Sequence, residues 1–368
     1  MKALPVPSAP GFEVDFEAWT AEYPWLRALR GCAQDSVHHA EGDVWIHTRM
    51  VCEALASNRE WRGLPEAARR RVFLSALLHD VGKPDCTRVE EGRVTSRGHS
   101  ERGAVIARRL LWEHGVPLAE REAICSAIRF HQAPFFLVDR PDSERSLFEI
   151  SLGTVCDELA RVTWSDATGR HCADQPKLLE RIELFRAYAE EKQCLTGPRA
   201  FPSAHARFEY FRTAGRDPSY APHEQFRCEV VLMSGLPGAG KSTWVAKQLP
   251  DWPVVSLDAI RDELDVDPSE KQGPVVSAAR DRARELLRAG TSFVWNATNI
   301  SRSVRSQCIE LFAGYGAKVR IVYLEVPPAR LFEQNRNREA RVPEKVMQRL
   351  LDKWTVPALT EAHVVEYV

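Results

Sequence analysis

One group of residues has the types and spacing needed to hold nucleotide phosphates. Residues 235–243 read GLPGAGKST and fit the pattern GxxxxGK[ST], after an apolar run and before a helical one. Lys241 would reach the β- and γ-phosphates, and the Ser242 hydroxyl would bind Mg²⁺. The residues expected to surround the nucleotide are Gly235, Gly238, Gly240, Lys241, Ser242 and Thr243. This segment predicts binding of ATP or another NTP together with Mg²⁺.

Two further segments in the same half could complete a phosphate-transfer site. Asp258 follows the apolar run 254–257 and could deprotonate an acceptor hydroxyl, while Arg261 could bind a phosphate on that acceptor. The alternative is a helix N-cap with a surface arginine. Segment 335–343, which reads NRNREARVP, resembles a lid whose Arg338 and Arg341 would contact the nucleotide. The alternative there is a solvated, charged helix.

A second group combines histidines with carboxylates in the first half of the chain. Its members are His47, His79, Asp80, His99, His131 and Asp166, each on or beside a predicted helix. Neighbouring helical residues point about 100° apart, so the adjacent pair His79-Asp80 can address one centre from two directions. Imidazole and carboxylate ligands without thiolates suit divalent transition metals such as Mn²⁺, Co²⁺, Ni²⁺, Fe²⁺ or Zn²⁺.

The elements that position these groups change in type along the chain. Apolar residues recur at helical spacing over 44–56, 68–80, 101–114 and 176–191, which predicts an all-α domain over 1–195. Residues 196–224 are rich in Pro, Gly and Ser and predict a connector with one short helix. Apolar runs at 228–235, 254–258, 292–298 and 319–326 alternate with helical segments, which predicts an α/β domain with a parallel sheet over 225–368. We therefore expect a multidomain protein.

Composition excludes several classes of protein. The 368 residues carry a net charge of −1, which argues against coating nucleic acid through bulk electrostatics. No apolar run approaches the roughly 20 residues that span a bilayer, and no signal peptide is evident, so no membrane association is expected. Nine cysteines without a CxxC pair indicate neither a disulfide framework nor a cysteine-based zinc site. A cytoplasmic location is the expectation.

The combined motifs resemble two known families. WIHT, LLHDVGKP, GHS, RFHQ and SDATGR resemble the HD-domain metal-dependent phosphohydrolases, in the form also found in some bacterial tRNA nucleotidyltransferases. GLPGAGKST, SLDAIR, NATN and the arginine-rich lid resemble the P-loop polynucleotide 5′-kinases. Their order along the chain is similar to that of bacterial HD-domain/polynucleotide-kinase enzymes, which heal broken RNA ends.

The resemblance assigns roles to individual residues. It implies that His47, His79, Asp80 and Asp166 bind one metal and that His99 and His131 hold a second, with Asp80 as the bridge. Lys83 would then face the substrate phosphate. The P-loop half departs from many P-loop kinases at Asn296, where those enzymes carry an acidic residue. Ser242 and Asp258 are therefore the better candidates for contact with Mg²⁺.

The resemblance implies a bifunctional end-healing enzyme. The HD domain would act as a metal-dependent phosphatase or cyclic phosphodiesterase that removes a 3′-phosphate, 2′-phosphate or 2′,3′-cyclic phosphate. The P-loop domain would use an NTP to phosphorylate 5′-hydroxyl ends of RNA or DNA, leaving ends that suit a ligase. Two alternatives stay open: a phosphohydrolase and kinase pair that acts on small nucleotides or metabolites, and a sensor that binds metal and nucleotide without turnover.

Overall fold

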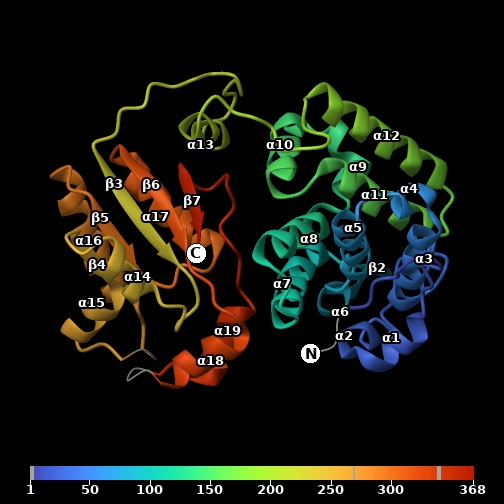
Figure 1. The fold of residues 1–368 in the computed structure, drawn as a ribbon, viewed down its shortest axis with the longest axis horizontal. Coiled ribbons are helices and arrows are strands. Elements are labelled where there is room, and N and C mark those ends of the chain that lie inside the picture. The colour runs from blue at the N-terminus through green and yellow to red at the C-terminus, as the bar shows by residue number, and fades with distance from the viewer. Residues whose placement is uncertain (1–3, 268–269, 338–340) are drawn as a thin grey trace. The chain divides into compact units, whose positions relative to one another are not determined.

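The chain folds into two compact units. The computed structural model describes residues 4–267, 270–337 and 341–368. One unit spans Met1–Arg199 and the other Ala200–Val368, and Figure 1 labels the elements of each. The first is helical and the second contains a parallel sheet, so the predicted fold class is confirmed. Along the described ranges, no helix is long and apolar enough to cross a membrane.

The helical unit is built around α5. This helix packs against α3, α8 and α11, because its apolar residues, such as Phe73 and Leu77, are fully buried among theirs. The α-helices of this unit are α1 (Phe16–Glu22), α2 (Pro24–Arg27), α3 (Val44–Ser57), α4 (Arg59–Arg62), α5 (Glu66–Leu78), α6 (Lys83–Cys86), α7 (His99–Glu113), α8 (Leu118–Phe130), α9 (Ala133–Phe136), α10 (Ser143–Gly153), α11 (Cys156–Thr168) and α12 (Gln175–Glu191). A short 3₁₀ helix spans Leu137–Asp139.

A small hairpin interrupts this helical unit. Strands β1 (Arg88–Glu90) and β2 (Arg93–Thr95) pair antiparallel between α6 and α7. The sequence predicted helices alone in this region, so the hairpin is a correction to that detail. Each strand has three residues, which is too short for an alternating apolar pattern to stand out.

Among its described residues, the second unit contains five parallel strands in the order β4-β5-β3-β6-β7. The strands are β3 (Cys228–Ser234), β4 (Val254–Ser256), β5 (Phe293–Asn296), β6 (Ala317–Tyr323) and β7 (Val364–Tyr367). The helices are α13 (Ala204–Arg212), α14 (Lys241–Gln248), α15 (Leu257–Glu263), α16 (Gly273–Arg288), α17 (Arg302–Gly314), α18 (Pro328–Arg336) and α19 (Glu344–Leu351). Strand β7 was not predicted, because VVEY is short and partly exposed.

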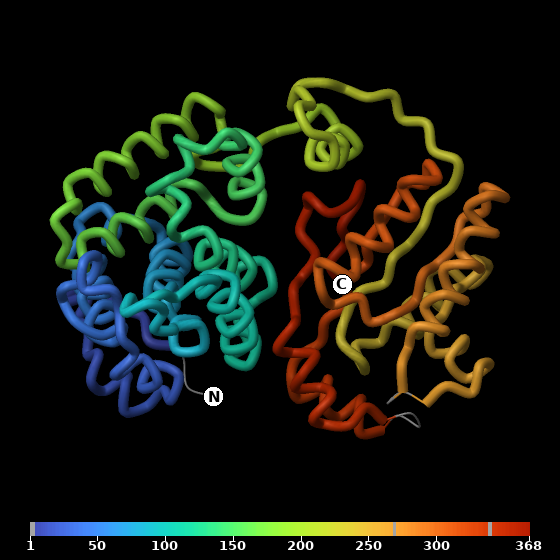
Figure 2. Tube along the Cα trace, turned by 180° about the vertical axis from the view of Figure 1, so that it is seen from behind, coloured from blue at the N-terminus to red at the C-terminus, as the bar shows by residue number. Residues whose placement is uncertain are grey.

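Helix α13 packs onto the second unit. Arg207 donates hydrogen bonds to the carbonyl oxygens of Leu359 and His363, at 3.0 and 3.3 Å. Phe208 is buried in the core beneath the sheet, with its ring centroid 4.0 Å from that of His363. From α13 an extended segment runs back to β3 (Figure 2). The division between the two units therefore lies between Arg199 and Ala200.

Candidate active sites

The histidines and aspartates singled out from the sequence meet at one place in the helical unit. We call His47, His79, Asp80, His99, His131 and Asp166 the histidine–aspartate centre. Helix α5 ends at Leu78, so His79 and Asp80 lie in the turn that follows it, before Lys83 begins α6. The remaining four members lie on α3, at the start of α7, just past the end of α8 and on α11.

Two glycines allow the helices to approach closely enough for these side chains to meet. A Cβ atom at Gly82 would lie 2.3 Å from the carbonyl oxygen of His99, so only glycine lets α7 begin beside the turn. A Cβ atom at Gly169 would lie 2.6 Å from the backbone nitrogen of Val51, which places the end of α11 directly on α3. These contacts bring His99 and Asp166 to the centre.

The backbone fixes the orientation of three of the four imidazoles. The Nδ1 atoms of His79, His99 and His131 lie 2.6 to 2.7 Å from carbonyl oxygens of the residues three positions earlier. A carbonyl can only accept, so each Nδ1 carries the proton and each Nε2 presents a lone pair to the centre. His47 differs, because its Nδ1 lies 2.9 Å from Glu41 Oε1 and its Nε2 lies 3.1 Å from Asp166 Oδ1, and against the effect of burial these two carboxylates raise its pKa.

The Asp80 carboxylate lies between two pairs of imidazoles. Its Oδ2 is 3.1 Å from His79 Nε2 and 3.8 Å from His47 Nε2. Its Oδ1 is 3.4 Å from His99 Nε2 and 3.9 Å from His131 Nε2. Asp166 Oδ1 joins the first pair, 3.1 Å from His47 Nε2. Each oxygen of Asp80 thus faces its own histidine pair, so both pairs could share this carboxylate when they hold metal.

The donor set fits divalent cations. The Nε2 atoms of His47 and His79 are 3.3 Å apart and those of His99 and His131 are 3.4 Å apart, and in the second pair both protons are on Nδ1. Both oxygens of Asp80 are buried, and among the described residues Oδ2 has an ion pair with Lys83 but neither oxygen accepts a well-aligned hydrogen bond. Buried lone pairs aimed at one another are unfavourable, and a cation between them removes the repulsion. These residues would hold such ions.

Ionisation states support the same reading. Burial lowers the pKa of His131 to about 3 and also lowers the pKa of His99, so both stay neutral as metal ligands must. Burial opposes ionisation of Asp80, but His79 and Lys83 hold the pKa of that carboxyl well below its usual range. Asp166 behaves similarly: against the effect of burial, Arg170 and His47 keep its pKa low. Both aspartates are therefore anionic at neutral pH.

Two cations border the centre. Lys83 Nζ lies 2.7 Å from Asp80 Oδ2 and donates to Gln34 Oε1 at 2.7 Å. Arg170 forms an ion pair with Asp166, and its guanidinium carbon is 5.2 Å from the ring centroid of Phe135. Lys83 therefore lies beside the Asp80 carboxylate, and its contact with a substrate phosphate stays a prediction.

Sequence reasoning gave no role to three residues that border this centre. Glu41 accepts a hydrogen bond from the His171 backbone at 2.9 Å and orients His47, yet it lies in a loop where no periodicity marks it. Gln34 likewise lies in a loop where no periodic pattern marks it. Arg170 could have been found, because Asp166 and Arg170 have the i, i+4 spacing of a helical ion pair.

In the second unit, the loop between β3 and α14 has the backbone of a phosphate cradle. Gly235, Gly238 and Gly240 have φ values of +146°, +87° and +94°, which glycine alone adopts readily. A Cβ atom at Gly235 would also lie 2.4 Å from the Leu324 carbonyl oxygen. Lys241 Nζ donates to the carbonyl oxygens of Gly235 and Leu236 at 2.8 and 3.0 Å. The lysine charge thus lies inside the loop where phosphates would bind.

The other predicted residues lie at or after the carboxyl ends of neighbouring strands. Ser242, beside Thr243 in the first turn of α14, accepts a hydrogen bond from Asn296 Nδ2 at 3.2 Å. Asn296 ends β5, so the amide occupies the position next to the hydroxyl proposed for Mg²⁺. Asp258 is in the first turn of α15, where its carboxylate is 73% exposed and accepts from Arg261 at 2.6 Å. Parallel strands end at one edge of the sheet, so these groups share that edge with the loop.

The arginine-rich segment is described only in part. Arg338 lies outside the described residues, whereas Arg341 is described and exposed. The Asn335 side chain donates to the Val342 carbonyl at 2.9 Å and accepts from the Val342 backbone at 3.1 Å. A Cβ atom at Gly238 would lie 3.4 Å from the backbone nitrogen of Asn335. Helix α18 therefore lies against the phosphate loop and holds the residue that follows Arg341.

Comparisons with known proteins match each unit separately. Residues 43–148 match the HD domain family, and residues 230–357 match a family described as AAA domain. A CC-adding tRNA nucleotidyltransferase from Thermus thermophilus is 37% identical over 124 residues, which is 33% of this chain and 25% of that relative. This chain therefore spans about a quarter of the length of the curated relative that it matches.

Among solved structures, a sugar kinase from Janibacter sp. HTCC2649 matches with a TM-score of 0.30 and 18% identity. The match covers 38% of this chain and 85% of that chain. A P-loop kinase-like domain implies NTP and Mg²⁺ as ligands, and an HD domain implies divalent metal ions. The chain is a fusion of an HD domain with a P-loop kinase-like domain.

Proposed function

We propose that this protein heals broken nucleic-acid ends. The HD unit removes a 3′-phosphate, 2′-phosphate or 2′,3′-cyclic phosphate, and the P-loop unit transfers a phosphoryl group from an NTP to a 5′-hydroxyl. The observation that carries the proposal is the presence, in one chain, of a buried histidine–aspartate centre bordered by Lys83 and a phosphate loop that holds Lys241. The resulting ends would suit a ligase.

In the HD unit the protein binds and orients the phosphate. A divalent ion, when bound, supplies an activated water near neutral pH. Lys83 Nζ, fixed between Asp80 and Gln34, binds a phosphate oxygen and offsets its charge. Glu41 keeps the proton of His47 on Nδ1, so that Nε2 stays available to a metal.

In the P-loop unit, Lys241 exchanges its carbonyl partners for the β- and γ-phosphates of the NTP. Asp258 accepts the proton of the attacking 5′-hydroxyl. Arg261, which is hydrogen-bonded to both Asp258 and Gln272, holds the phosphate of the acceptor end. Arg341, together with Arg338, contacts the nucleotide phosphates as the lid closes.

A polynucleotide substrate has support from one comparison. The relative from Thermus thermophilus is by its name an enzyme that adds CC to tRNA. A segment similar to part of a tRNA-modifying enzyme, fused to a kinase-like domain, favours substrates that are nucleic-acid ends. The alternative is a pair of activities on small nucleotides or metabolites.

One gel assay tests the proposal. A labelled RNA oligonucleotide with a 5′-hydroxyl and a 2′,3′-cyclic phosphate is incubated with the full chain, NTP, Mg²⁺ and Mn²⁺. A DNA oligonucleotide with a 5′-hydroxyl and a 3′-phosphate is incubated in the same way. We expect both ends to be converted, with a higher kcat/KM than for mononucleotides bearing the same groups. Equal kcat/KM on mononucleotides would favour the small-molecule alternative, and binding without conversion would favour a sensor.

A further inference from the structure

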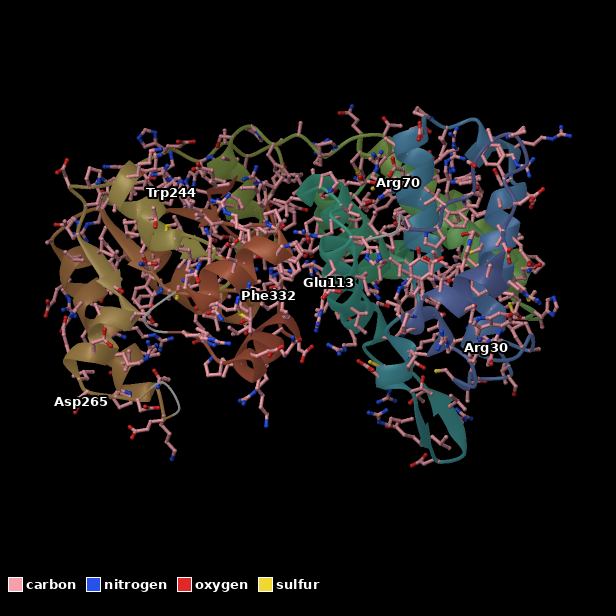
Figure 3. All side chains as sticks on the ribbon, turned by 60° about the horizontal axis from the view of Figure 1, so that its bottom comes forward. Arg30, Arg70, Glu113, Trp244, Asp265 and Phe332 are labelled. Atoms are coloured by element: carbon pink, nitrogen blue, oxygen red, sulfur yellow. The ribbon has the colours of Figure 1, made fainter. Side chains whose placement is uncertain are left out.

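The β1–β2 hairpin projects from the helical unit next to the candidate centre. Figure 3 shows its two short strands, drawn in teal, standing out from the helices. The hairpin occupies the chain between Lys83, which begins α6, and His99, which begins α7. No part of the proposed chemistry uses it.

Hydrogen bonds tie the stem of the hairpin to the centre on both sides. Thr87 Oγ1 donates to the Lys83 carbonyl at 2.8 Å and lies 2.8 Å from Ser96 Oγ, across the stem. The Ser96 carbonyl is in turn the oxygen that accepts from His99 Nδ1. The base of the hairpin is therefore held to Lys83, which begins α6, and to His99, which begins α7.

The strands themselves have little to pack against. All three residues of β1 are exposed, and the apolar Val89 among them is 72% exposed. A tight turn at Glu91 and Gly92, with φ values of 51° and 77°, closes the tip. A two-stranded ribbon of this kind is marginally stable alone, and nothing in the hydrophobic core of the unit requires it.

Two arginines on the β2 side are available to a ligand. Arg93 and Arg97 are exposed, and within the described ranges neither guanidinium has a hydrogen-bond or ion-pair partner. Arg97 precedes His99 by two residues, and a Cβ atom at the intervening Gly98 would meet nothing within 4 Å, so no other residue covers the backbone on that side. By contrast, Arg88 donates to the Thr87 and Asp85 carbonyls.

We propose that the hairpin is an arm that binds the sugar-phosphate backbone of a single-stranded polynucleotide whose 3′ end occupies the histidine–aspartate centre. The inference rests on the proposed function and adds the element that distinguishes a strand from a mononucleotide. Arg93 begins β2 beside the tip of the hairpin and Arg97 lies in the turn that follows the strand, so the two guanidinium groups contact separate parts of the backbone. Glu90 and Glu91 offset the positive charge of the arm. Binding of the polynucleotide therefore depends on the two guanidinium contacts rather than on the net charge of the hairpin.

The test compares two substrates in one protein. The double variant Arg93→Glu/Arg97→Glu is assayed for phosphate release from a single-stranded oligonucleotide 3′-phosphate and from a nucleoside 3′-monophosphate, in the full chain with Mn²⁺. We expect kcat/KM on the oligonucleotide to fall about tenfold or more, because two phosphate contacts are lost. The mononucleotide rate stays unchanged, and the salt dependence of oligonucleotide binding becomes shallower.

A matched variant controls for net charge. Arg59→Glu/Arg140→Glu makes the same change of charge at exposed arginines on other elements of the helical unit, and we expect wild-type kinetics from it. Three results would contradict the proposed role of the arm. They are an equal loss of activity in both variants, an unchanged oligonucleotide rate in Arg93→Glu/Arg97→Glu, and an equal loss of activity on the mononucleotide and the oligonucleotide. Failure of the proposed function would show differently, as a wild-type protein that does not prefer the oligonucleotide at all.

Discussion

In the helical unit the Asp80 carboxylate is 2% exposed, whereas in the P-loop unit the Asp258 carboxylate is 73% exposed. The first lies among imidazoles whose orientations the backbone already fixes. The second shares an exposed ion pair with Arg261, and Lys241 is held by carbonyls of its own loop. The HD site is thus built before any ligand arrives, and the P-loop site is completed by its nucleotide. Burial makes the difference, because a buried charge must have its partners in the folded protein.

The largest expected effect is complete separation of the two activities. Asp80→Ala should lower phosphate release on the order of 10³-fold or more, since it removes the carboxylate shared by both histidine pairs. Lys241→Ala should do the same to 5′ phosphorylation, because the charge on the β/γ-phosphates is lost. Each variant is assayed for both reactions in parallel. If either substitution removed both activities from a folded protein, the sites would not be independent.

The exposed pair in the P-loop unit gives the next effect. Asp258→Asn should lower kcat for 5′ phosphorylation on the order of 10²-fold, because the amide cannot take the proton. Arg261→Ala should mainly raise KM for the acceptor strand while the affinity for NTP stays unchanged. Steady-state kinetics with each substrate varied in turn measures both. An Arg261→Ala protein defective in NTP binding alone would show that this arginine does not contact the acceptor.

The ratio of activity in a transition metal to activity in Mg²⁺ should differ between the two sites by about tenfold or more, because their donor atoms prefer different ions. After chelator treatment, Mg²⁺ alone should restore the kinase, whose ligands are oxygen atoms. Phosphate release should be weak in Mg²⁺ and increase with Mn²⁺, Co²⁺, Ni²⁺, Fe²⁺ or Zn²⁺, because four imidazoles face the centre. His99→Ala and His131→Ala should impair phosphate release and spare the kinase. Full phosphate release in Mg²⁺, with no transition metal in the purified protein, would contradict the assignment.

The smallest expected effect concerns His363, a histidine outside the histidine–aspartate centre. His363 is buried against Phe208 and accepts from the Val319 backbone at 3.0 Å, and burial lowers its pKa to about 3. Between pH 6.5 and 3 the unfolded state binds the extra proton, so the stability of the P-loop unit falls as pH falls, by up to about 1.4 kcal/mol per pH unit. Hydrogen exchange of the Val319 amide measures this slope.

The matched variant for that measurement is His363→Asn. The asparagine oxygen can replace Nδ1 as the acceptor for Val319 but does not titrate in this range. We expect the pH dependence of Val319 exchange to be shallower in the variant than in the wild type. Equal slopes would mean that His363 is not buried in its neutral form.

Much of the fold and of both candidate sites follows from the sequence. Periodic apolar residues over 68–80 predicted α5, which spans Glu66–Leu78, because a helix buried on one face needs that spacing. The phosphate loop was predicted because its glycines and lysine all lie within one short segment, 235–243. The hairpin could not be predicted because each strand has three residues, and Gln34 and Glu41 could not because their partners Lys83 and His171 are 49 and 130 residues away. The Asp258–Arg261 ion pair was also not predicted, although both residues were singled out.

The carbonyl partners of His79, His99 and His131 also bear on which mutations the protein tolerates. These acceptors belong to the backbone of Ala76, Ser96 and Ile128, so no change of side chain at those positions removes them. The backbone geometry of the helices and turns thus determines which nitrogen carries the proton in these three imidazoles. His47 differs, because its orienting partner is the side chain of Glu41, which one substitution can replace. During evolution, His47 is therefore the imidazole of this centre whose orienting partner could change without altering the fold.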